Sequence, residues 1–159
     1  KRYKCRIRKP WYKVPSVFST KLAMLKRSHD APRLIYNQYQ AYTTDTAYRI
    51  KPKSNINEEK LSYCFLNPLT AIFAELEGRS YGGGVMELVP SEIRKLFIPL
   101  PEKIEFDLSE LNNSMMNRSM EQILAEQGKK IFSHMGYDDE VVEKLIHIWN
   151  KLKNRRQRS

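Results

Sequence analysis

The chain has 159 residues, which suits one domain with a helical addition, and 41% of them are hydrophobic, enough to build a core. It carries 28 Lys and Arg residues against 18 Asp and Glu residues, a formal net charge of +10. Its cysteines, Cys5 and Cys64, exclude a disulfide framework and a cysteine-rich zinc site, and they favour a reducing compartment. No apolar run approaches a membrane span, and no signal peptide opens the chain. We therefore expect a cytoplasmic protein with no membrane partner. Because the chain opens with Lys1 directly in strand-like sequence, we also expect it to be a piece of a longer protein.

The positive charge is concentrated at one end of the chain. Residues 1–53 carry a net charge of +12, residues 54–150 a net charge of −7, and residues 151–159 a net charge of +5. A positive field on one half of a protein favours a polyanionic partner. Counterion release from phosphates rewards many separate Lys and Arg contacts, so nucleic acid is the leading expected partner.

Residues 1–53 show the short, alternating pattern of strands. Tyr3, Cys5 and Ile7 alternate with basic residues, and further strands are predicted at residues 17–19, 21–25, 33–37 and 47–51. Turn-forming residues near positions 28–30 and 43–45 separate them. This part predicts a small, twisted, mostly antiparallel sheet.

Two helices and two strands are expected next. Asn57 is the predicted N-cap of the first helix, and Asn67 with Pro68 opens the second, which Gly78 ends. Residues 85–90 predict a short strand, with a helix starting at residues 91–92, and the proline-bounded segment 97–101 predicts an edge strand.

Three consecutive glycines at residues 82–84 need a structural or functional explanation, since glycine loses the most backbone entropy on folding. Two interpretations remain open from the residues alone: a bare loop that lies against a phosphate backbone, or a tight structural turn. No strand is expected to lead into the glycines, no Lys follows them, and a strand comes next. A nucleotide-binding loop is therefore not expected.

The last third of the chain predicts helices. A short helix is expected over residues 107–117, a second ends at Gly136, and Asp138 caps a third, so that the last two form an antiparallel hairpin. Residues 153–159 are expected to fray. The predicted class is α+β, with a sheet-and-helix domain at residues 1–101 and a helical extension at residues 102–159, which offers a surface for self-association.

Three stretches carry a resemblance to a known family. The first is Arg8-Lys9-Pro10-Trp11-Tyr12; the second is Pro32-Arg33-Leu34-Ile35-Tyr36-Asn37, followed by Thr46-Ala47-Tyr48-Arg49-Ile50; the third runs from Phe65-Leu66-Asn67 through Gly82-Gly83-Gly84-Val85-Met86-Glu87-Leu88 to Ile98-Pro99-Leu100-Pro101. Together they resemble the C-terminal target-recognition region of adenine-N6 DNA methyltransferases from bacterial restriction-modification systems, including forms fused to a nuclease. The resemblance covers residues 8–101 and is most specific in its last third.

The resemblance implies sequence-specific binding of duplex DNA, next to an N-terminal methyltransferase domain that binds S-adenosylmethionine. The family's Asn-Pro-Pro-aromatic catalytic motif is missing here, and Asn67-Pro68-Leu69 echoes only its first two residues. We therefore expect no cofactor and no catalytic residue in this chain itself. His29, His134 and His147 are isolated, and no metal site is predicted.

The candidate DNA-binding residues are basic, amide, aromatic or glycine positions. Basic side chains neutralise phosphates, Arg and Asn read guanine and adenine edges, and Tyr can stack. The candidates are Lys4, Arg6, Arg8, Lys9, Tyr12, Arg33, Asn37, Arg49, Arg79, Ser80, Tyr81, Gly82 and Gly83. For Asn37, a role as a turn cap remains equally open.

Two other functions remain open. The chain can be a structural domain that packs on the catalytic domain, with its helical hairpin as an assembly surface. It can also be an RNA-binding accessory domain that stacks single-stranded bases on Tyr12, Tyr36, Tyr39 and Tyr42.

Overall fold

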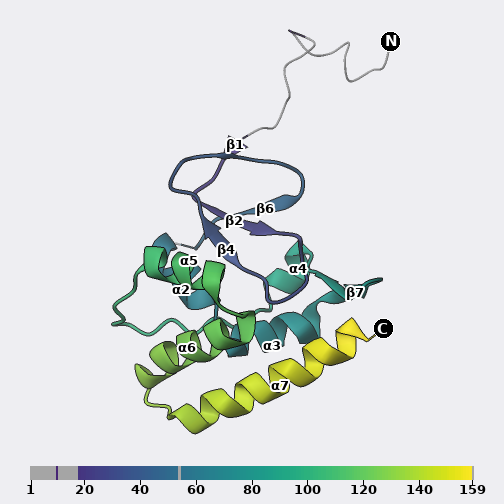
Figure 1. The fold of residues 1–159 in the computed structure, drawn as a ribbon. Coiled ribbons are helices and arrows are strands. Elements are labelled where there is room, and N and C mark those ends of the chain that lie inside the picture. The colour runs from purple at the N-terminus through teal and green to yellow at the C-terminus, as the bar shows by residue number, and fades with distance from the viewer. Residues whose placement is uncertain (1–9, 11–17, 54, 159) are drawn as a thin grey trace.

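The computed structural model describes Pro10, residues 18–53 and residues 55–158 of the chain. In these residues six strands come first and the helices come after them, with one β-hairpin between α3 and α4 (Figure 1). The elements in order are β1 (Phe18–Ser19), β2 (Leu22–Leu25), β3 (Arg27–Ser28), β4 (Leu34–Tyr36), β5 (Tyr42–Thr43), β6 (Ala47–Ile50), α2 (Glu58–Phe65), α3 (Pro68–Glu77), β7 (Arg79–Tyr81), β8 (Val85–Glu87), α4 (Pro90–Ile93), α5 (Leu108–Asn117), α6 (Met120–Ser133) and α7 (Asp139–Gln157).

The strands form three small antiparallel sheets, with orders β1-β5, β4-β2-β6 and β3-β8-β7. Ala23 in the central strand β2 lies opposite both Ile35 and Arg49, so these three side chains share one face of their sheet. Met24 and Leu34 lie on the other face and pack in the core. The predicted α+β class is confirmed.

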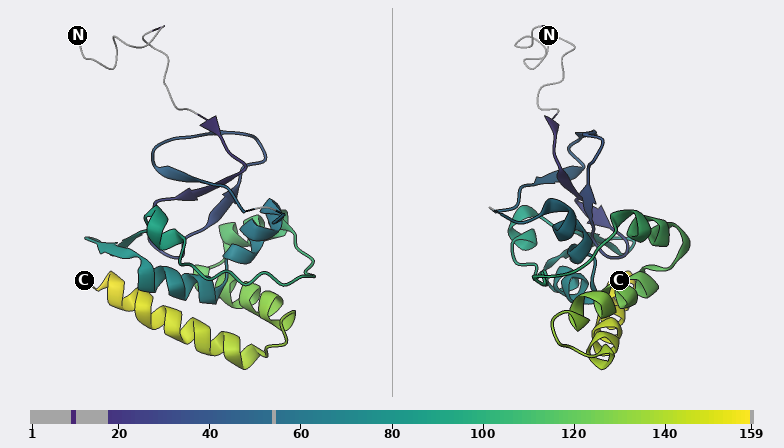
Figure 2. Two further views of the ribbon diagram at one scale, coloured as in Figure 1. Left: turned by 180° about the vertical axis from the view of Figure 1, so that it is seen from behind. Right: turned by 90° about the vertical axis from the view of Figure 1, so that its left-hand side faces the viewer.

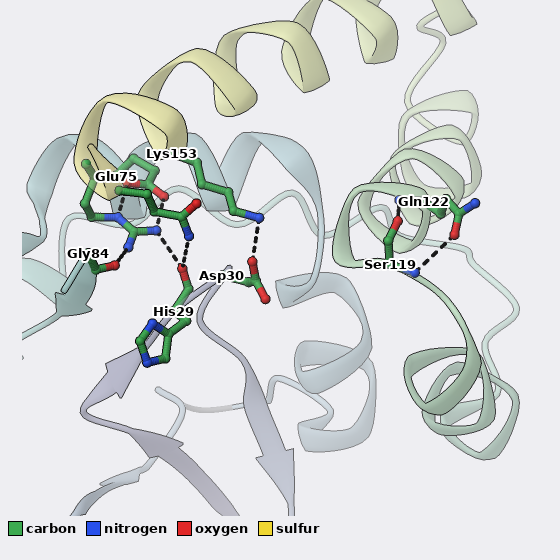
Figure 3. Close-up of polar contacts among 9 residues, drawn as sticks. His29, Asp30, Glu75, Gly84, Ser119, Gln122 and Lys153 are labelled. Atoms are coloured by element: carbon green, nitrogen blue, oxygen red, sulfur yellow. Dashed lines mark hydrogen bonds and ion pairs between the residues drawn. The ribbon is translucent and has the colours of Figure 1, made fainter. Parts of the chain in front are cut away.

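Side-chain caps start the helices where the sequence predicts them. Asn57, Asn67, Asp107 and Asp138 each accept a hydrogen bond from a backbone N–H in the first turn of α2, α3, α5 and α7. At α6, Ser119 and Gln122 cap one another's backbone N–H, as Figure 3 shows.

The β1-β5 and β4-β2-β6 sheets lie at one end of the molecule, and α3, α6 and α7 form a helical layer at the other (Figures 1 and 2). The β3-β8-β7 sheet lies beside the C-terminal end of α7. One core cluster joins Met24 of the sheet to Phe65 and Ala74 on the helices. The other runs from Tyr63 on α2 through Ile131 on α6 to the fully buried Trp149 on α7. Helices of residues 102–159 thus share a core with α2 and α3, while the division into two domains at residue 101 stays a prediction.

Two strand predictions were wrong. Residues 97–101 form no strand; instead the hydroxyl of Thr70 donates to the carbonyl oxygen of Phe97 at 2.7 Å and holds this segment against α3. A strand does lead into the glycines: β7 pairs with β8, so residues 82–84 form the turn of a hairpin. We call β7, this turn and β8 the glycine hairpin.

The predicted fraying of the tail was also wrong, because α7 continues to Gln157. Arg156 is buried and pairs with Glu75 on α3, with Nε and an oxygen of the carboxylate 2.8 Å apart. The same guanidinium donates to the carbonyl oxygens of His29 and Gly84 (Figure 3). Beside it, Lys153 contacts Asp30 at 2.5 Å. The tail therefore holds α3, the segment after β3 and the glycine hairpin together.

Candidate nucleic-acid interface

Most basic side chains of residues 18–53 have no acidic partner among the described residues. Residues 18–53 contain seven Lys and Arg residues, and only Lys21 and Arg27 have an acidic partner within the described residues. On the helices, by contrast, many cations are paired, for example Lys129 with Asp139. We call the remaining five cations the basic sheet surface: Lys26, Arg33, Arg49, Lys51 and Lys53.

Aromatic rings lie between these cations. The Nζ of Lys26 is 5.0 Å from the ring centroid of Tyr48, and the Cζ of Arg49 is 5.0 Å from that of Phe18. Such stacking orients the cations without neutralising them. Tyr42, in β5, is 72% exposed, so a large ring is also available to a partner. The surface combines positive charge with stacking faces, as nucleic-acid interfaces do.

A groove of about 1240 Å³ runs beside the edge strand β4. Arg33 and residues 35–39 line one wall, and both polar and apolar residues of α5 line the other. Arg33 is exposed, as expected for a residue that contacts a partner.

Asn37 holds a turn. Its amide nitrogen donates to the carbonyl oxygens of Thr20 and Ala41, both at 2.8 Å, and its amide oxygen accepts from the backbone N–H of Ala41 at 2.9 Å. Both amide hydrogens are therefore used within the chain, which favours the turn-capping interpretation over base contact.

The cations on the glycine hairpin and on the neighbouring strand β3 are paired with acids. Arg79 contacts Glu92 at 2.7 Å, and Arg27 contacts Glu87 at 2.6 Å and lies 5.6 Å from the ring of Tyr81. Glu87 thus pairs with a cation of the neighbouring strand β3. These two ion pairs leave the face of the hairpin much less positive than the basic sheet surface.

Glu92 is mostly buried, and a backbone hydrogen bond from Val89 at 2.8 Å, together with Arg79, lowers the pKa of its carboxyl group. It therefore remains a carboxylate at neutral pH and continues to anchor Arg79.

The three glycines have different surroundings. A Cβ added at Gly82 or Gly83 would meet nothing within 4 Å, so the tip of the hairpin, with Ser80 exposed beside it, is open. Gly84 has a φ of +69° and its added Cβ would lie 2.9 Å from the Cα of Gln157. Structure thus accounts for Gly84 and, through its φ of +77°, for Gly83, while the backbone at Gly82 and Gly83 remains accessible. Because the turn joins two antiparallel strands, it has no helix N-terminus to hold the phosphate of a nucleotide cofactor.

Five predicted residues lie outside the described residues: Lys4, Arg6, Arg8, Lys9 and Tyr12. Conversely, sequence reasoning missed Lys26, Lys51 and Lys53 as members of the surface. The available signal was their position in a stretch with only two acids.

No catalytic arrangement is evident in the part of the chain that the structure describes. Burial raises the pKa of the Cys64 thiol to about 11, so Cys64 is not a poised nucleophile. Within the described ranges, no group of His, Cys, Asp and Glu residues could hold a metal ion. No described helix is long and apolar enough to cross a membrane.

The family model described as "Type II methyltransferase M.Eco57I, C-terminal domain" matches residues 1–132. The chain belongs to this family. The match confirms the resemblance to the C-terminal region of a restriction-modification methyltransferase and extends it beyond residue 101, through α5 and most of α6. Helix α7, which carries Arg156, lies outside the match. No curated protein and no solved structure matches the chain.

Proposed function

We propose that this chain binds duplex DNA in the cytoplasm and supplies the target specificity of an adenine-N6 methyltransferase of a restriction-modification system. Membership of the M.Eco57I C-terminal domain family supports the methyltransferase context. Chemistry on the base takes place in an N-terminal domain that binds S-adenosylmethionine, while this domain holds the DNA around the extruded adenine.

The observation that carries the proposal is the basic sheet surface. Five cations without an acidic partner in the described residues lie in or next to the strands β2, β4 and β6, and residues 1–17 add seven Lys and Arg residues and no acid. Bringing so many like charges together opposes folding unless a polyanion neutralises them. Phosphate contacts position a protein on DNA, and base contacts provide its specificity.

The test is the salt dependence of duplex binding. Replacing Lys26, Arg49, Lys51 and Lys53 by Gln should weaken binding to every duplex sequence. The slope of log K against log salt should become less negative by about 0.9 for each phosphate that the variant no longer neutralises. Replacing Lys4, Arg6 and Arg8 by Gln should act in the same way.

A matched control removes four positive charges from α7, by replacing Lys144, Lys151, Arg155 and Arg158 with Gln. Its net charge changes equally, but its slope should stay near that of the unchanged chain. Equal slopes for the two quadruple variants would reject the basic sheet surface as the DNA contact.

Binding of single-stranded RNA is the second candidate, because Tyr39 and Tyr42 are 86% and 72% exposed. Tyr36 is less suited to stacking, since a hydrogen bond to Glu59 holds it and raises the pKa of its hydroxyl. Competition between duplex DNA and single-stranded RNA decides: displacement of duplex by RNA at equal concentration would favour the RNA function. A chain that binds neither and dimerises would favour the assembly function.

A further inference from the structure

The groove beside β4 has two walls with unsatisfied hydrogen-bonding groups. Asn112 and Asn113 on α5 are exposed and line one wall, and Arg33 and Gln38 line the other. Among the described residues, none of these four side chains has a hydrogen-bond or ion-pair partner, whereas Asn37 beside them is fully engaged. Donors and acceptors in both walls thus face the same space.

The carboxylates that line the groove are already engaged. Asp30 pairs with Lys153, Glu59 accepts a hydrogen bond from Tyr36, and Asp107 caps the first turn of α5. The free polar groups of the groove include three amides and the guanidinium of Arg33, beside the hydroxyls of Ser28, Tyr39 and Ser109 and the ring of His29. Among them the amides and the guanidinium are the side chains that read bases, since Asn and Gln bind adenine edges and Arg binds guanine edges.

The two asparagines have no structural role that explains their place in α5. Asn is a poor helix former, and neither side chain caps the helix or packs in the core. Leu108, Leu111 and Met115 provide the packing of α5 and also line the groove. Residues that disfavour their own secondary structure, and make no packing or capping contact in return, are expected at functional sites.

Figure 1 places α5 on the same side of the molecule as β4, next to the strands of the basic sheet surface. A helix fits the major groove of B-DNA, whose base edges present a distinct pattern for each pair. The cations that would contact phosphates thus lie near the amides that would contact bases.

We propose that α5 reads base edges of the target, with Asn112 and Asn113 contacting adenine and Arg33 and Gln38 completing the readout from the opposite wall. This inference rests on the proposed DNA binding and deepens it. It moves part of the specificity into residues 102–117, where the sequence predicts no site residue.

The experiment selects bound duplexes from a library with a randomised 12-base-pair centre, using the 159-residue chain. The unchanged chain should enrich a defined sequence, and the Asn112→Ala, Asn113→Ala variant should lose about tenfold or more of discrimination at one or two positions, since a bidentate pair is worth about 1–3 kcal/mol. Its affinity for an arbitrary duplex and its salt slope should not change, because both side chains are neutral. Ala favours a helix more than Asn does, so the loss cannot come from unfolding of α5.

Asn154→Ala is the matched control, an exposed asparagine of α7 outside the groove. It should retain the full preference, while Arg33→Ala should relax a different position of the target. If the unchanged chain shows a preference that the double variant keeps, the role of α5 is rejected and DNA recognition stands. If the unchanged chain does not bind the library, both proposals fail.

Discussion

The side chain of Arg156 connects α7 to three other parts of the fold. Its side chain is 7% exposed and that of Glu75 is 2% exposed, so both charges have left water. Two carbonyl oxygens, of His29 and Gly84, accept further hydrogen bonds from its guanidinium. A buried ion pair of this kind is costly to break, because the remaining charge keeps its desolvation penalty without its partner.

Arg156→Ala should therefore lower the free energy of unfolding by about 3–5 kcal/mol, as should Glu75→Ala. Urea denaturation of the two variants measures this. Arg155→Ala is the control, since Arg155 is exposed on the same helix and should change stability by less than about 0.5 kcal/mol. Equal effects of the two arginine variants would contradict the role given to Arg156.

Glu92 gives a prediction on pH. Because the pKa of its carboxyl group is lowered in the folded chain, the carboxylate stabilises the fold above the ordinary carboxyl pKa. That contribution is lost as the pH falls through the lowered pKa. Glu92→Gln should be less stable than the unchanged chain at pH 7, and its stability should fall less between pH 5 and pH 3. Parallel stability curves for the two proteins would contradict this.

At the scale of elements, the sequence predicted the starts of helices well, because the cap and the helix are adjacent in the chain. The signals are local: Asn57, the Asn67-Pro68 pair and Asp138 each start the helix that directly follows them in the chain. The strand β7 was not predicted, because its pairing depends on β8 and its three exposed residues show no alternation of apolar and polar side chains. The segment at 97–101 has the composition of an edge strand, but a side-chain contact to Thr70 holds it instead.

The candidate site was predicted only in part, because contacts between residues far apart in the chain cannot be read from local sequence. Composition located the basic end of the chain and the exposed Arg33 and Arg49. The engagement of Arg79 by Glu92 and of Asn37 by Ala41 depends on the folded geometry. The free amides of α5 became visible only when β4 and α5 were placed on two walls of one groove.

The glycine hairpin provides a test within one element. Gly84→Ala should destabilise the fold by more than about 1 kcal/mol, because a left-handed backbone disfavours a Cβ. The backbone of Gln157 also blocks the space that this Cβ would need. Gly82→Ala should change stability by less than about 0.5 kcal/mol, since its surroundings are open. Urea midpoints of both variants decide; similar losses at the two positions would mean that the turn is not supported by α7.

For the whole molecule, α7 is part of the fold although the family match ends at residue 132. It packs on α3 and α6, and its Val142 and Trp149 are 1% and 0% exposed. Removing it would expose Ile131 and Ala71, which belong to the same core cluster.

A chain that ends at Gly136 should therefore unfold at a lower temperature and with less cooperativity than the full chain, and it should be cut faster by protease. The comparison protein keeps α7 but carries Lys144→Ala and Lys151→Ala, two exposed positions that should leave the melting temperature nearly unchanged. A shortened chain that melts as the full chain does would show that the core of α2, α3 and α6 is complete by itself.

The contacts of Arg156 also set an order of events during synthesis. They span 81 residues to Glu75, 72 to Gly84 and 127 to His29. At a translation rate of about 5–20 residues per second, Glu75 is made roughly 4–16 seconds before its partner. During that interval the carboxylate of Glu75 must stay hydrated, so α3 cannot yet take its final buried position. We therefore expect the glycine hairpin and the segment after β3 to be fixed last, when the final turn of α7 has left the ribosome.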